Sequence, residues 1–250
     1  MDLLLCNDDG IDATGIKTLE SALVEFGQVW VVAPETEQSA SSHALTMHEP
    51  LRVRQRGDRH WSVSGTPVDC IYLAIHHLLP RPPDLVLSGI NRGSNLGNDV
   101  FYSGTVAAAM EACFQGLASV ALSLHVEPED GENHWKTAAE VAQRVVRGLK
   151  DTPLPPQILL NVNVPNIPRS ELRGLKVVAQ GQRHYAPMVD VRTDPRGRPY
   201  YWIGGTHMQF EPIPGTDGPS VEEGWATVTP FRPDLTAREA FGVLRTWTDA

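Results

Sequence analysis

Two adjacent carboxylates near the start of the chain are well suited to bind a metal ion. Asp8 and Asp9 follow the apolar run of residues 2–6 and precede Gly10. Like charges on neighbouring residues repel, so we expect a hard divalent cation to hold them together. The alternative is a polar Asp-Gly turn whose side chains bond to their own backbone. This segment alone fits both interpretations, and the rest of the chain favours the metal.

Two further oxygen donors are expected beside these carboxylates. Ser39 lies in the polar segment 35–49 and Asn91 lies in the segment 88–97, each after a predicted buried strand. Carboxylate, hydroxyl and amide oxygens suit Mg²⁺, Mn²⁺ or Ca²⁺, whereas zinc prefers His or Cys at spacings that this sequence lacks. His43 is the one histidine that we expect near this site. We predict one divalent cation per subunit, preferably Mg²⁺ or Mn²⁺. Its predicted ligands are Asp8, Asp9, Ser39 and Asn91.

A second group of residues has the composition of a phosphate site. Ser103 and Thr105 stand at the start of a predicted helix of small residues, with Gly104 between them. Unpaired N–H groups and the helix dipole attract anions at such a position, and the hydroxyls can donate hydrogen bonds. An ordinary helix cap is the alternative, which this short segment alone favours. A metal site and an anion site at one sheet edge together indicate metal-assisted hydrolysis of a phosphate ester.

The pattern of elements brings these segments to one edge of a sheet. Up to about residue 165, short buried strands alternate with helical patterns, which implies βαβ units and an α/β fold with a mainly parallel sheet. Such sheets bind their ligands outside the carboxyl ends of the strands, where the segments above begin. The strands are predicted at residues 2–6, 29–33, 84–88, 119–124 and 158–162.

The pattern changes after about residue 165. We expect residues 1–165 to form the catalytic core, and residues 166–250 to form an antiparallel β extension and a helical arm that is not an independent domain. The segment 212–215 is predicted to be a stiff hinge that carries the apolar residues 221–250 onto a neighbouring subunit. An arm folded back on its own core is the alternative. Strands are predicted at 175–179, 188–192, 200–203 and 225–229, and a final helix at 235–246.

The composition of the chain indicates which classes of partner and which cellular compartment to expect. The net charge of −9 argues against nucleic acid or an anionic membrane as the main partner. The three cysteines form no CxxC motif and lie in apolar segments, so we expect free thiols in a reducing compartment. The first predicted strand begins at residue 2 and no apolar run reaches membrane length. We therefore expect a cytoplasmic protein.

With these motifs assembled, the sequence resembles the survival protein E (SurE) family of metal-dependent 5′/3′-nucleotidases. The resemblance extends over nearly the whole chain, and its motifs occur in the same order. They are Asn7–Gly10, Gly65–Cys70, Ser88–Asn91, Asn95–Gly97, Tyr102–Val106, Pro214–Asp217, Val228–Pro230 and Asp234–Thr236.

The resemblance implies a Rossmann-like core, a C-terminal arm exchanged between subunits, and homodimers or homotetramers. It also implies hydrolysis of nucleoside monophosphates, with short polyphosphate as a further substrate of some members. Its metal ligands carry over onto the four residues predicted above. Around Ser39 the family usually has an Arg-Ser-Gly pattern, whereas this chain has Gln38-Ser39-Ala40 and keeps only the serine. The phosphate contacts carry over onto Ser103, Gly104 and Thr105, and Asn95 is assigned to the same group.

We expect a phosphomonoesterase of the 5′-nucleotidase or acid-phosphatase type, in which Asp8 and Asp9 are catalytic and the attacking water is activated by metal. Phosphatases of the haloacid-dehalogenase type need Asp-x-Asp after the first strand. Gly10 and Ile11 stand two residues beyond the two aspartates, so this alternative is disfavoured. A short-chain polyphosphate hydrolase and a non-catalytic nucleotide sensor remain alternatives, because binding and hydrolysis need most of the same groups.

Overall fold

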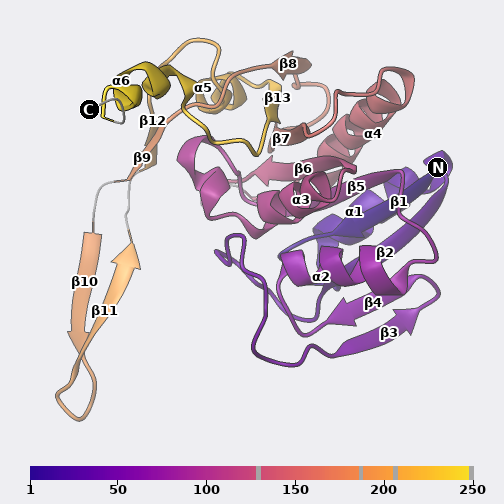
Figure 1. Ribbon diagram of the computed structural model, residues 1–250, viewed down its shortest axis with the longest axis horizontal. Coiled ribbons are helices and arrows are strands. Elements are labelled where there is room, and N and C mark those ends of the chain that lie inside the picture. Colours follow the sequence, from indigo (N-terminus) through magenta and orange to yellow (C-terminus); the bar gives the residue numbers. More distant parts are fainter. Residues whose placement is uncertain (128–130, 186–187, 205–207, 248–250) are drawn as a thin grey trace.

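A long central sheet forms the frame of the molecule. The computed structural model describes residues 1–127, 131–185, 188–204 and 208–247 (Figure 1). Within these residues, nine strands form one sheet in the order β3-β4-β2-β1-β5-β6-β7-β13-β8. They are β1 (Asp2–Cys6), β2 (Gln28–Pro34), β3 (Val53–Gly57), β4 (His60–Val63), β5 (Leu85–Arg92), β6 (Ala118–His125), β7 (Leu159–Pro165), β8 (Leu175–Val177) and β13 (Ala226–Phe231).

The directions of the strands confirm the predicted fold class. From β4 to β7 across the sheet, neighbouring strands pair in parallel. Strand β3 pairs antiparallel with β4, and β13 pairs antiparallel with β7. The chain therefore has a Rossmann-like, mainly parallel sheet with antiparallel strands toward its C-terminal end.

Helices cover both faces of this sheet, which explains why its strands are apolar on both sides. Helices α1 (Thr14–Leu23) and α4 (Trp135–Asp151) cover one face, and α2 (Pro67–Leu73) and α3 (Gly104–Phe114) cover the other. Alternate residues of β1 divide between the two cores: Leu3 and Leu5 pack with α1 and α4, and Leu4 and Cys6 pack with α2. The carboxyl end of β1 is thereby fixed, and Asp8 and Asp9 follow it directly.

Strand β5 is longer than predicted. The sequence indicated a strand ending at Ser88 and a loop from Gly89, but β5 continues to Arg92 with an irregular register between Ser88 and Asn91. Asn91 then pairs with Ser123 of β6. The extension contains glycine and polar residues, so the hydrophobic pattern did not predict it. Main-chain pairing with β6 maintains the strand there.

The C-terminal part of the chain differs from the prediction in one respect. We expected a hinge at 212–215 that carries residues 221–250 away from the core, but β13 lies inside the main sheet and packs on its own chain. Helix α5 (Asp217–Glu222), which the sequence analysis missed, leads into β13 and buries Asp217 completely. The hinge expectation is therefore wrong up to residue 231, since Ala226 and Val228 complete the apolar core. Residues 248–250 of the predicted arm lie outside the described residues.

The final helix is shorter than the predicted 235–246. Only Phe241–Arg245 form α6, after a 3₁₀ turn at Arg238–Ala240. Asp234 accepts hydrogen bonds from the Thr236 N–H and the Arg238 guanidinium, and such local bonds compete with helix formation. Phe241 to Trp247 remain exposed.

A separate hairpin projects from the same end of the molecule. In the part of the chain that the structure describes, strands β10 (Met188–Thr193) and β11 (Pro199–Gly204) pair only with each other, and Figure 1 shows them standing clear of the main sheet. A second short pair, β9 (Arg183–Tyr185) with β12 (Met208–Phe210), lies at the base of this hairpin. Strands β9 and β12 were not predicted, because three residues are too few to show a period.

Candidate functional site

A cavity of about 380 Å³ lies beyond the carboxyl ends of β1, β2 and β5. This is the sheet edge at which the sequence predicted the site. Six of the eight predicted site residues line this cavity: Asp8, Asp9, Ser39, Asn91, Asn95 and Ser103. The other two, Gly104 and Thr105, lie immediately behind Asp8.

Asp8 is buried, with 5% of its surface exposed, and its carboxylate is held from one side. The Thr105 hydroxyl donates to Oδ1 of Asp8 at 2.5 Å, and the Thr105 N–H donates to Oδ2 at 3.2 Å. The Asp8 carbonyl accepts a hydrogen bond from the Gln38 N–H at 2.7 Å, which ties the loop after β1 to the loop after β2. Burial raises the pKa of Asp8 although the Thr105 hydrogen bonds oppose this shift.

Asp9 is half-buried beside it. Its Oδ2 accepts a hydrogen bond from the Arg92 N–H at 3.2 Å. Burial and, next, the negative charge of Asp8 raise the pKa of Asp9 to about 6. The two carboxylates repel each other and are partly desolvated. A bound cation would reduce this repulsion.

The two neutral candidate ligands offer oxygen atoms. The Asn91 side chain donates through Nδ2 to the Gly93 carbonyl at 2.8 Å, which leaves Oδ1 as an acceptor. The Ser39 hydroxyl donates to Glu37 at 2.6 Å and retains its oxygen lone pairs. Within the described residues, no group of three or more His, Cys, Asp and Glu side chains is placed to hold a metal ion. A cation here would therefore rest on two carboxylates and neutral oxygens, a donor set that fits a hard divalent ion.

The sequence predicted unpaired N–H groups at the N-terminus of α3, but two of these groups are bonded to side chains of the protein. The Ser103 hydroxyl caps the helix by accepting from the Val106 N–H at 3.1 Å, and the Thr105 N–H is bonded to Asp8. At position 104 a Cβ atom would lie 2.9 Å from the Asp8 Cβ, so only glycine allows this approach. Two of the first N–H groups of α3 are thus occupied by a serine and by the Asp8 carboxylate. The helix dipole acts on that carboxylate.

Asn95 is the most firmly held residue at the cavity. Its N–H donates to Oδ1 of Asn163, and its carbonyl accepts from Nδ2 of Asn161 and Nδ2 of Asn163, all within 3.0 Å. Its own Nδ2 donates to the Ser123 hydroxyl at 2.7 Å. These hydrogen bonds with Asn161 and Asn163 keep Asn95 in a fixed position, although Oδ1 of Asn161 has no partner among the described residues.

Sequence reasoning missed the aromatic wall of the cavity. Tyr102 and Tyr185 line it together with Asp99, and Tyr185 comes from β9, far from the other site residues in sequence. The Tyr185 hydroxyl donates to Asp99, whose other oxygen accepts from the Arg183 guanidinium at 2.5 Å. Burial and the hydrogen bond to Asp99 raise the pKa of Tyr185 to about 12. Tyr102 belongs to a motif that the sequence analysis quoted, but no local signal identifies Tyr185.

His43 does not join the site as expected. Its Nε2 faces the Glu111 carboxylate at 3.1 Å, and its ring packs against Phe114, at the end of α3. This pair holds the pKa of Glu111 below its usual value. Among the described residues, those that line the cavity include no histidine. No helix in the described part of the chain is both long enough and apolar enough to cross a membrane.

Comparisons with known proteins agree with these observations. Residues 3–187 match the family described as "Survival protein SurE". A protein of Geotalea daltonii named 5′-nucleotidase SurE is 47% identical over 247 residues, covering 99% of both chains. One of Serratia proteamaculans named 5′/3′-nucleotidase SurE is 46% identical over 248 residues, covering 99% of this chain and 96% of the relative. The crystal structure of the SurE protein from Aquifex aeolicus matches with a TM-score of 0.88 at 39% identity, covering 100% of both chains. The chain therefore belongs to the SurE family.

Proposed function

We propose that this chain is a metal-dependent phosphomonoesterase that hydrolyses nucleoside monophosphates to nucleoside and phosphate. The observation that carries the proposal is one cavity with an oxygen-rich group at Asp8 and Asp9 and an aromatic wall at Tyr102 and Tyr185. The names of the relatives, 5′-nucleotidase and 5′/3′-nucleotidase, support the same reaction.

The residues that would hold the cation are Asp8, Asp9, Ser39 and Asn91. Their oxygen donors fit Mg²⁺ or Mn²⁺, one ion per subunit. When bound, such an ion supplies positive charge to a phosphoryl oxygen and lowers the pKa of a bound water. The contribution of the chain is to fix the ligands: Thr105 orients Asp8, and the Arg92 N–H orients Asp9.

The phosphate group is proposed to lie between these ligands and the start of α3. Ser103 accepts a hydrogen bond at its oxygen, so its own O–H is available to donate to a phosphoryl oxygen. Asn95, fixed by the buried amides, is proposed to contact the same group. Gly104 and Thr105 are proposed to contact the same phosphate at the start of α3, where Thr105 also holds Asp8. A donor that is already in position stabilises charge in the transition state without reorganisation.

The two tyrosines give the cavity its proposed selectivity for nucleotides. An aromatic face binds any nucleobase by stacking, and each stacked base contributes about 1–3 kcal/mol. The Tyr185 ring is held by its hydrogen bond to Asp99, which is fixed in turn by the nearly buried Arg183. We propose that residues 1–165 form the catalytic core and that residues 166–250 extend it and supply Tyr185.

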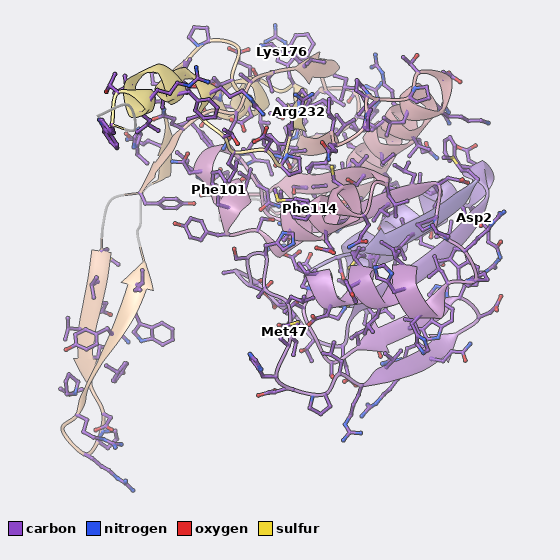
Figure 2. The ribbon with its side chains drawn as sticks, viewed as in Figure 1. Asp2, Met47, Phe101, Phe114, Lys176 and Arg232 are labelled. Atoms are coloured by element: carbon purple, nitrogen blue, oxygen red, sulfur yellow. The ribbon has the colours of Figure 1, made fainter. Side chains whose placement is uncertain are left out.

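The hairpin supports the proposal of a homodimer or homotetramer. In the antiparallel register, Val189 lies opposite Ile203 and Val191 lies opposite Tyr201, so these four side chains share one face. All four are exposed, with Ile203 at 92%. The side chains of the hairpin stand away from the body, and the exposed Phe101 lies on the side from which the hairpin projects (Figure 2). An apolar face of this kind is typical of contact with another subunit.

We also propose that the protein acts in the cytoplasm. Cys6, Cys70 and Cys113 are buried and free, as expected of cysteines in a reducing compartment.

The decisive experiment measures phosphate release from a panel of substrates by protein reconstituted with Mn²⁺ or Mg²⁺. The panel contains purine and pyrimidine 5′- and 3′-monophosphates, glycerol 2-phosphate and tripolyphosphate. We expect the monophosphates to be hydrolysed with the highest kcat/KM. Tight binding of monophosphates without release would indicate a nucleotide sensor. Preferred cleavage of tripolyphosphate would indicate a polyphosphate hydrolase.

A further inference from the structure

Of the described residues that line the cavity, Arg92 is the one that is cationic. It is the last residue of β5 and its side chain is exposed. Its backbone N–H is bonded to Asp9, but its guanidinium forms no ion pair or hydrogen bond with a described residue. A charged side chain with five donors is therefore available at the cavity.

The charges around it are almost all negative. Asp8, Asp9, Glu37 and Asp99 line the same cavity, and of these Asp99 is neutralised by Arg183. The other three carry three negative charges when ionised, and a divalent cation offsets two of them. The remaining charge would repel a phosphomonoester, which is a dianion at neutral pH. One further positive charge is needed to neutralise the site before the substrate enters.

We propose that Arg92 binds the phosphate group of the substrate and is a further substrate-binding residue of this chain. The inference rests on the proposed function, because it assumes that a phosphomonoester occupies the cavity. The guanidinium is planar and can donate two parallel hydrogen bonds to two phosphoryl oxygens.

The main chain of Arg92 orients Asp9, and its side chain is proposed to bind phosphate; the fold keeps the main chain in place independently of the side chain. Arg92 pairs with Leu124 in the β5–β6 register, and the Gly93 N–H donates to the Leu124 carbonyl at 2.9 Å. The hydrogen bond to Asp9 uses only the main chain of Arg92, while the charge of the guanidinium partly offsets the rise in the pKa of Asp9 that burial causes. Replacing the side chain therefore keeps the hydrogen bond that orients Asp9 and removes the positive charge.

Removing this charge has opposite effects on the two ions that the cavity is proposed to bind. A cation in the site is repelled by the guanidinium, and a phosphate is attracted by it. Arg92→Gln should therefore weaken phosphate binding while Mn²⁺ binding stays equal or becomes tighter. A variant that merely distorts the site would weaken both.

The test compares Arg92→Gln, Arg92→Lys and Arg144→Gln, the last being a matched control on the exposed face of α4. Calorimetry measures the Kd of Mn²⁺ alone and of inorganic phosphate at saturating Mn²⁺. We expect Arg92→Gln to weaken phosphate binding by about tenfold or more, the size of a lost charge-assisted hydrogen bond. The phosphate Kd of Arg92→Lys should lie between those of the wild type and Arg92→Gln, because lysine keeps the positive charge but cannot donate two parallel hydrogen bonds. Arg144→Gln should match the wild type.

Two results would overturn the inference. One is a phosphate Kd for Arg92→Gln within roughly twofold of the wild type, as expected for a solvated surface charge. The other is parallel loss of Mn²⁺ and phosphate binding in both Arg92 variants. Both Kd measurements are made without turnover. A failure of the Arg92 inference can therefore be distinguished from a failure of the proposed function, in which the wild-type protein binds phosphate but releases none from nucleotides.

Discussion

Thr105 and Asp8, 97 positions apart in sequence, are joined by a 2.5 Å hydrogen bond from the threonine hydroxyl to Oδ1 of the aspartate. The Thr105 N–H completes a second contact to the same carboxylate. Both groups belong to the first turn of α3, so the start of this helix positions an acidic residue. The hydrogen bonds favour the ionised form of Asp8 and oppose the effect of its burial.

Thr105→Val should therefore weaken metal binding. Loss of the hydroxyl raises the pKa of Asp8 further and frees its side chain, and we expect a Mn²⁺ Kd about tenfold higher. Thr105→Ser keeps the hydroxyl and should bind Mn²⁺ nearly as the wild type does. Calorimetric titration of metal-stripped protein measures both. If Thr105→Val bound Mn²⁺ normally and lost only phosphate, Thr105 would be a phosphate contact, as the sequence first indicated.

The two possible roles of Thr105 explain what sequence can and cannot predict here. The sequence Ser103-Gly104-Thr105 alone favours a helix cap over an anion site, and it does not show that Thr105 bonds to Asp8. The choice depends on where Asp8 lies, which only the fold determines. Tyr185 is a stronger example, because its place at the cavity follows from the Asp99–Arg183 contact across 84 residues. No local pattern contains that information.

The sheet was easier to predict, since its central strands are buried on both faces. The runs at residues 2–6, 29–33 and 119–124 are mostly apolar, and each forms a strand within one residue of the expected start. The extension of β5 through Asn91 was not predictable, because pairing with β6 sustains it without apolar side chains. The exposed hairpin strands at 188–193 and 199–204 were predicted at 188–192 and 200–203, because Gly, Pro and Asp turns separate these short segments and no long helix lies between them.

The raised pKa of Asp9 predicts a stability that depends on pH. Its pKa is 3.8 ordinarily and about 6 in the folded, metal-free chain. Between these values the folded state binds more protons than the unfolded state, so the free energy of unfolding falls as the pH rises. Asp9→Asn lacks this titration. Its Tm advantage over the wild type should therefore grow from about pH 4 to about pH 6 and then stay constant.

Scanning calorimetry of metal-stripped protein measures this difference, with Asp151→Asn as an exposed control that should show no such trend. Saturating Mn²⁺ should remove the advantage of Asp9→Asn, because the cation stabilises the ionised carboxylate. A Tm difference that is the same at every pH would show that Asp9 does not titrate in this range.

Tyr185→Ala should discriminate between substrates with and without a base. Removing the ring loses the proposed stacking, so the KM for a nucleoside monophosphate should rise about tenfold, as expected for one lost stack. The KM for glycerol 2-phosphate should change little. Tyr185→Phe keeps the ring but loses the hydrogen bond to Asp99, so its KM for the nucleotide should lie between those of the wild type and Tyr185→Ala. An equal rise in KM for both substrates would show that Tyr185 shapes the phosphate end of the cavity instead.

Substitutions on the apolar face of the hairpin should change the assembly. In the double variant Val191→Lys with Ile203→Lys, two charges replace exposed apolar side chains that lie on one face. We expect a smaller mass by light scattering than for the wild type. Asp190→Lys changes the opposite face and should keep the wild-type mass. A wild-type mass for the double variant would place the subunit contact elsewhere, with the exposed residues 241–247 as the next candidate.

The measurement that tests the central claim most directly is phosphate release from a nucleoside monophosphate by metal-stripped protein titrated with Mn²⁺. We predict no activity without metal, full recovery on adding Mn²⁺, and a kcat for Asp8→Asn lower by a factor on the order of 10² at saturating metal. Activity that persists after chelation, or that is unchanged in Asp8→Asn at limiting Mn²⁺, would contradict a metal-dependent reaction at these carboxylates.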